Sequence, residues 1–148
     1  MAEINLTQEE ADALMEMEKH KVNDDKWLFP LHGIVSIPLT SADKREDFLL
    51  DIRRARIDLS KGTYQNRARQ VVILVRLDFG TKPHRNPNGD IIESPHIHIY
   101  RGGFGHKWAD PINKKHFSKP DDIWQLLKDF MKFCNITEPP VIERGLFT

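Results

Sequence analysis

The spacing of apolar residues predicts a helix, then a set of strands, then a second helix. Thr7 followed by Glu10 is typical of a capping box, so we expect a first helix from there to about His20. Its apolar positions form only a thin stripe, which indicates an acidic surface helix. Ser118 is the expected N-cap of the second helix. The broad apolar stripe of that helix should pack on the sheet and consists of Ile123, Leu126, Leu127, Phe130, Phe133 and Cys134.

Two segments after the first helix have the composition of strands. Residues 27–29 and 34–37 are separated by Pro30 and Gly33, which predicts one interrupted edge strand or two short ones. Residues 48–59 alternate, which predicts a half-buried strand. We expect the inner face of that strand to carry Ala55, Ile57 and Leu59.

The middle of the chain predicts the centre of the sheet. Residues 64–79 read as one long strand whose apolar centre, Val71–Val75, is typical of a strand buried on both faces. The turn at residues 60–63 should join it to the preceding strand as an antiparallel hairpin. Residues 80–94 are dense in Pro, Asn and Gly and predict a loop, after which residues 95–100 form a short strand.

Composition supports an ordered globular protein. The chain has 148 residues, of which 39% are hydrophobic and 30% charged, and this length is common for one domain. We therefore expect residues 1–148 to form a single α+β domain with a mainly antiparallel sheet. An acidic N-terminal helix and an amphipathic C-terminal helix should flank that sheet. The single cysteine, Cys134, is expected to be a small buried hydrophobic residue.

The sequence also predicts a location. Residues Met1–Leu6 lack the basic and apolar regions of a signal peptide. No apolar run approaches the roughly 20 residues that span a bilayer. We therefore expect a cytoplasmic protein that does not interact with membranes.

Charge is distributed unevenly although the formal net charge is zero. Residues 1–25 carry eight acidic and two basic side chains, whereas residues 53–85 carry nine basic and two acidic ones. Pairing of the two long strands should gather arginines on one sheet surface, namely Arg54, Arg56, Arg67 and Arg69. Such a patch would either dock the acidic first helix or bind phosphate.

The candidate chemistry is concentrated in one segment. Four of the seven histidines, His84, His96, His98 and His106, fall within 23 consecutive residues, together with several basic side chains. Alternation along the strand at residues 95–100 places His96, His98 and Tyr100 on one face and the two isoleucines on the other.

Three interpretations of these histidines stay open. In the first, the isoleucines face the core and the histidines are the solvated side of an ordinary strand. In the second, His96 and His98 divide the roles of general acid and base at a phosphodiester, while Arg or Lys stabilises negative charge. In the third, His96 and His98 bind zinc with His84 or His106 as a third ligand.

Three stretches of the chain form a recognisable pattern: residues 75–78, residues 83–89, and Pro95-His96-Ile97-His98-Ile99-Tyr100-Arg101-Gly102-Gly103-Phe104-Gly105-His106-Lys107-Trp108-Ala109. In this pattern the chain resembles a family of small uncharacterised proteins of bacteria and their mobile elements. The similarity extends from Thr7 through the second helix. This resemblance implies no particular activity.

The chain also has an Arg-x-Asp strand end, a Pro-His and a Pro-His-x-His element, which contain Arg76, Asp78, His84, His96 and His98. This local pattern resembles that of TumE-type toxins of toxin–antitoxin pairs, which look like ribonucleases. The present chain departs from the pattern by its greater length, its acidic first helix, its Gly-Gly-Phe-Gly loop and Trp108.

These observations lead to the hypothesis of a metal-independent endoribonuclease of toxin type, using the RNA 2′-hydroxyl as nucleophile. The expected catalytic residues are His96, His98, Arg101 and Lys107. The expected substrate-binding residues are Arg76, His84, Arg85 and Tyr100. Expected partners are RNA and a protein such as an antitoxin. A non-catalytic binding protein of a phage or mobile element is the alternative, and a metal-dependent hydrolase is the third possibility.

Overall fold

The computed structural model describes residues 5–145, so most of Met1–Leu6 lies outside the described residues. Its main element is an eight-stranded sheet in the order β10-β9-β6-β5-β4-β3-β1-β11, antiparallel except between β1 and β11. The strands are β1 (Lys19–Lys21), β3 (Gly33–Ser41), β4 (Asp47–Arg54), β5 (Gly62–Ala68), β6 (Val72–Phe79), β9 (His96–Ile99), β10 (Ala109–Pro111) and β11 (Ile136–Glu138). Two small ladders pair β2 (Lys26–Leu28) with β12 (Val141–Glu143), and β7 (His84–Arg85) with β8 (Ile91–Ile92).

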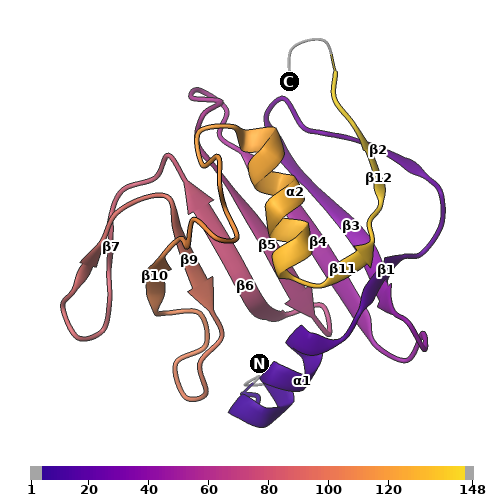
Figure 1. Ribbon diagram of the computed structural model, residues 1–148, viewed down its shortest axis with the longest axis horizontal. Coiled ribbons are helices and arrows are strands. Elements are labelled where there is room, and N and C mark those ends of the chain that lie inside the picture. The colour runs from indigo at the N-terminus through magenta and orange to yellow at the C-terminus, as the bar shows by residue number, and fades with distance from the viewer. Residues whose placement is uncertain (1–4, 146–148) are drawn as a thin grey trace.

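Two helices, α1 (Gln8–Glu16) and α2 (Ile123–Phe133), accompany the sheet. Figure 1 shows α2 lying across one face of the sheet and α1 at one end of it. The predicted α+β fold with a mainly antiparallel sheet is therefore confirmed. In the described part of the chain, neither helix is long and apolar enough to cross a membrane.

The predicted N-cap residue is correct for α1 and wrong for α2. The capping box of α1 is confirmed, because Thr7 accepts from the Glu10 amide and the Glu10 carboxylate accepts from the Thr7 amide. Ser118 is wrong as the N-cap of α2. Asp122 is the N-cap, because its carboxylate accepts from the first free amides of the helix, those of Trp124 and Gln125.

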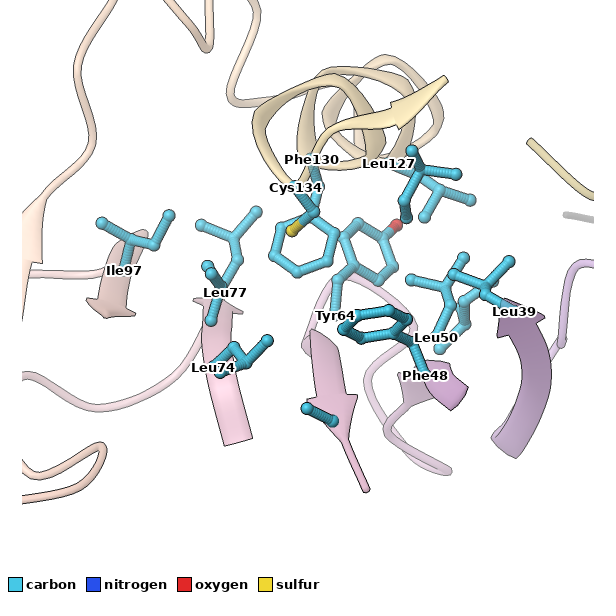
Figure 2. Packing of buried hydrophobic residues seen from close by; sticks show 14 of the residues in the cluster. Leu39, Phe48, Leu50, Tyr64, Leu74, Leu77, Ile97, Leu127, Phe130 and Cys134 are labelled. Carbon is cyan, nitrogen blue, oxygen red and sulfur yellow. The ribbon is translucent and has the colours of Figure 1, made fainter. Parts of the chain in front are cut away.

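The core lies between α2 and the sheet (Figure 2). Tyr64 is buried at its centre, and its hydroxyl donates to the Ile123 carbonyl at 2.7 Å. The predicted stripe of α2 is confirmed, since Leu126, Leu127 and Phe130 are fully buried. Cys134 is buried as predicted. Burial raises the pKa of its thiol to about 12, so this thiol stays protonated at neutral pH.

The first helix is shorter than predicted and ends at Glu16, because the chain turns at Met17 into β1. The buried Lys19 Nζ donates to the carbonyl oxygens of Met15 and Met17 at 3.0 Å, and to that of Cys134 at 2.8 Å. Met17 and Cys134 are the C-cap residues of the two helices. One ammonium group therefore caps the C-terminal ends of both.

The long strand predicted at residues 64–79 is wrong, because the chain reverses within it. Arg69 and Gln70 form a two-residue turn with positive φ angles of 51° and 69°, and this turn separates β5 from β6. Such left-handed turns suit the twist of a hairpin, but Asn-Gly or Asp-Gly is their usual sequence signal. The predicted antiparallel hairpin is confirmed as the β4–β5 pair, but its turn is wrong: the connection is residues 55–61, and Gly62 and Thr63 already pair with β4.

The strand predicted at residues 48–59 ends at Arg54, and its expected inner face is wrong. Phe48, Leu50 and Ile52 face the core instead, while Ile57 lies beyond the strand and is 97% exposed. The expected edge position of residues 34–37 is also wrong, because β3 lies between β1 and β4.

The predicted arginine patch is wrong as well. Arg54 is buried and donates to the backbone oxygens of Pro30 and Leu59. Arg67 and Arg69 instead pair with the acidic side chains of Asp51 and Glu46, respectively.

Candidate functional site

Two rows of polar side chains cross the sheet on the face opposite α2. Side chains alternate along each strand, and the residues between them, such as Leu50, Tyr64, Leu77 and Ile97, point into the core (Figure 2). In the sheet register, one row consists of Asp51, Gln65, Arg76 and His98. The second row consists of Arg53, Thr63, Asp78 and His96. The antiparallel order therefore brings residues from four strands into one polar surface.

At one end of the first row, Asp51 forms an ion pair with Arg67. Arg67 donates to both carboxylate oxygens of Asp51, at 2.6 and 2.9 Å, and Gln65 donates to one of them at 2.6 Å. Burial alone would raise the pKa of Asp51, but the hydrogen bonds from Arg67, Ser36 and Gln65 lower it. Asp51 is therefore ionised at neutral pH and fully engaged with neighbouring donors.

Toward the other end of the two rows, several side chains contact the carboxylate of Asp78. Its Oδ1 accepts from the Thr63 hydroxyl at 2.9 Å, and its Oδ2 accepts from Arg76 Nη2 at 3.0 Å. The Nε2 atoms of His96 and His98 lie 3.2 and 3.3 Å from the same Oδ2. Burial favours a higher pKa for Asp78, but hydrogen bonds with both histidines and the charge of Arg76 hold its pKa well below the ordinary value.

Both histidines of the strand are buried, with exposed fractions of 2% for His96 and 0% for His98. The interpretation that they form a solvated strand face is therefore wrong. Nδ1 of His96 lies 3.3 Å from the Glu93 carbonyl oxygen, and Nδ1 of His98 lies 2.8 Å from that of His106. These backbone contacts fix both rings with Nε2 directed at Asp78.

A third histidine joins them from the β7–β8 hairpin. The His84 ring lies 4.7 Å from the His98 ring and 5.9 Å from the His96 ring, between centroids. Its Nε2 lies 2.7 Å from the Lys107 carbonyl oxygen. Asn86 holds this hairpin in place, because its side-chain amide exchanges two hydrogen bonds with the backbone of Ala109, at 2.8 and 2.9 Å.

A pocket of about 340 Å³ opens beside the histidines. Its lining is strongly basic and consists of Arg76, His84, Arg85, Pro87, His106 and Lys107. Burial and the neighbouring charge of Arg76 lower the pKa of His106. The pocket therefore combines two imidazoles with three permanent cations, a set suited to binding an anion and transferring protons.

The structure brings together most of the residues expected from the sequence. His84, His96, His98 and Arg76 form the cluster, and Arg85 and Lys107 line the pocket beside it. Tyr100 and Arg101 lie elsewhere. The Tyr100 hydroxyl binds the backbone of Leu6, while Arg101 pairs with Asp110 at 3.5 Å and lies over the Trp108 ring at 4.8 Å.

Two members of the cluster, Thr63 and Asp78, are missing from the expected catalytic and binding residues. Asp78 could be found from its alternation with Arg76, which places both on one strand face. Thr63 could be found only from the exact register of the β5–β6 hairpin, where it lies opposite Asp78. That register depends on the Arg69-Gln70 turn, which carries no usual turn signal.

One group in the described part of the chain has the composition and spacing of a metal site. Ligand atoms of Asp78, His96 and His98 all lie within 4.8 Å of one another. The expected third ligand, His84 or His106, is replaced in this group by the carboxylate of Asp78.

Comparison with known proteins gives one result. A family model described as a family of unknown function, DUF6978, matches residues 6–136. The chain belongs to the DUF6978 family. Neither a curated protein nor a solved structure matches it. The predicted membership of an uncharacterised family is therefore confirmed, and the matched part of this DUF6978 chain includes the whole histidine cluster and its pocket.

Proposed function

We propose that this protein cleaves phosphodiester bonds of RNA at the basic pocket beside the histidine cluster. The observation that carries the proposal is the convergence of five residues from three separate segments: Arg76, Asp78, His84, His96 and His98. A buried network of this kind is costly unless every member is satisfied. Its position directly beneath a basic pocket favours a functional role.

The proposed chemistry uses the histidines that line the pocket, His84 and His106. One imidazole accepts the proton of the 2′-hydroxyl as its oxygen attacks phosphorus, and the other donates a proton to the departing 5′-oxygen. The products are a 2′,3′-cyclic phosphate and a 5′-hydroxyl. Arg76, Arg85 and Lys107 stabilise the negative charge on the phosphoryl oxygens.

The burial of His96 and His98 favours a supporting role for this pair. Both rings lie against Asp78, which in turn holds Arg76 Nη2 at 3.0 Å. Arg76 Nη2 also lies 3.2 Å from His98 Nε2. We infer that His96 and His98 are positioning residues, which fix the guanidinium of Arg76 at the pocket wall and support the His84 ring.

The local resemblance to TumE-type toxins, seen in the sequence alone, falls on the same residues. The residues that carry it, Arg76, Asp78, His84, His96 and His98, are the five that meet in the cluster. A toxin would be neutralised by a protein antitoxin, and the proposal includes such a partner. Growth arrest on expression, relieved by a neighbouring gene product, is the expected behaviour in a cell.

The proposal is tested by incubating the purified protein with single-stranded RNA and with DNA of the same sequence. We expect cleavage of RNA alone, because DNA lacks the attacking hydroxyl. His84→Ala should reduce the rate at least about 100-fold, since general acid–base catalysis contributes at least that much. His32→Ala, at an exposed histidine outside the pocket, is the matched control. Binding of RNA without cleavage would favour the non-catalytic alternative.

A metal-dependent hydrolase is the second candidate, favoured by one observation. Zinc bonds of about 2.0–2.1 Å place tetrahedral ligands about 3.3–3.4 Å apart. Asp78 Oδ2 lies 3.2 and 3.3 Å from the Nε2 atoms of His96 and His98, whose Nδ1 atoms face backbone carbonyls as in metal sites. Arg76 Nη2 competes for the same oxygen.

Metal analysis separates the two candidates. Protein purified without added metal should contain about one zinc per chain under the second candidate. His98→Ala should remove that zinc, and chelation should abolish cleavage of RNA. Under the acid–base proposal, cleavage continues in excess chelator.

A further inference from the structure

A second pocket, of about 470 Å³, lies on the polar sheet face next to the basic pocket. Its wall includes Arg53 of β4, Gln65 of β5 and Arg76 of β6. Arg76 also lines the basic pocket, so its side chain is part of the wall of both pockets. A ligand held at Arg76 can therefore extend into either pocket.

The second pocket is suited to an anion, because its acidic groups are already engaged. Asp51 is bound by Arg67 and Gln65, and Asp78 is bound by Arg76. Arg53 is exposed, and no hydrogen bond or ion pair joins its side chain to the described residues. Its positive charge is therefore available to a ligand.

Two buried polar atoms in the pocket wall point to a polar ligand. Thr81 Oγ1 and Arg76 Nε have no hydrogen-bond partner among the described residues. A buried polar atom without a partner is costly, and a ligand or ordered water is the usual way to satisfy it. Ile34 adds an apolar patch to the same wall, with 62% of its surface exposed.

We propose that this pocket binds the nucleotide next to the scissile phosphate of a single-stranded RNA. Arg53 contacts its phosphate, Gln65 and Thr81 bind its polar groups, and the apolar side chain of Ile34 packs against the sugar or base. Single-stranded RNA is favoured, because a base can enter such a pocket only when it is unpaired and unstacked. This inference rests on the proposed function and extends it to the way in which the sheet face binds the RNA substrate.

Binding of a single-stranded oligonucleotide that the protein cannot cleave tests the inference. The probe is a fluorescein-labelled single-stranded deoxyoligonucleotide, which lacks the attacking 2′-hydroxyl, titrated by fluorescence polarisation. We expect Arg53→Ala to weaken binding about tenfold and to lower the salt dependence, because one phosphate contact is lost. Arg45→Ala, at an exposed arginine in the β3–β4 turn, should bind as the wild type does. Thermal unfolding verifies that both variants are folded.

The outcomes distinguish this inference from the proposed function. Equal affinity of Arg53→Ala and wild type, or no binding of the probe by the wild type, overturns the nucleotide pocket. If binding depends on Arg53 but RNA is not cleaved, the pocket stands and the cleavage proposal fails. Preference for a double-stranded probe over the single strand also overturns the inference.

Discussion

Arg76 Nη2 lies 3.0 Å from Asp78 Oδ2, two residues further along the same strand face. This contact links the buried histidines to the two pockets, because Asp78 contacts His96 and His98 while Arg76 lines both pockets. A long, flexible arginine is thereby held in one position. The position of the Arg76 guanidinium in the wall of the basic pocket therefore depends on the carboxylate of Asp78.

Thr63→Val tests the support of that carboxylate. The Thr63 hydroxyl donates to Asp78 Oδ1 at 2.9 Å, and valine keeps the branched shape without the donor. We expect the free energy of unfolding to fall by about 1–2 kcal/mol, because a hydrogen bond to a charged group is lost. Urea unfolding measures this change. RNA cleavage should lose kcat with little change in KM, and an unchanged stability and kcat would argue against the network.

Tyr100→Phe separates the structural role of this tyrosine from substrate binding. Its buried hydroxyl accepts from the Leu6 amide and donates to the Leu6 carbonyl, both at 2.8 Å. Removing it should destabilise the fold by about 1–3 kcal/mol, because two buried backbone groups lose their partner. Binding and cleavage of RNA should be unchanged at temperatures where the variant is folded. A raised KM would instead place Tyr100 at the substrate.

Lys19 gives a prediction about pH. Burial lowers its pKa from 10.5 to about 8 in the folded protein. Between these values the unfolded chain binds more protons than the folded one. The free energy of unfolding contributed by Lys19 should therefore rise with pH, by up to about 1.4 kcal/mol per pH unit.

The measurement compares urea unfolding at pH 7 and pH 10. The wild type should gain stability relative to Lys19→Met over this range, because only the wild type has the titrating group. Lys114→Met, at an exposed lysine, is the control and should follow the wild type. Parallel pH profiles for all three proteins would mean that Lys19 titrates as an ordinary lysine.

The sequence predicted the histidine face but not what surrounds it. Alternation at residues 95–100 was sufficient to place His96 and His98 together, because a strand needs only local information. Their burial against Asp78 depends on the β6–β9 register, and the position of Thr63 depends on the Arg69-Gln70 turn. His84 reaches the cluster through a loop that Asn86 holds at Ala109. Such long-range contacts leave no periodic pattern in one sequence.

Metal-free cleavage of RNA by this protein is tested most directly by analysing the ends of RNA fragments produced in excess chelator. Metal-free attack by the 2′-hydroxyl must leave a 2′,3′-cyclic phosphate on one fragment and a 5′-hydroxyl on the other. We predict these ends for the wild type and for His32→Ala, and at least about 100-fold slower release of such fragments for His84→Ala. Intact RNA with the wild-type protein, or fragments carrying a 3′-hydroxyl and a 5′-phosphate, would contradict the account.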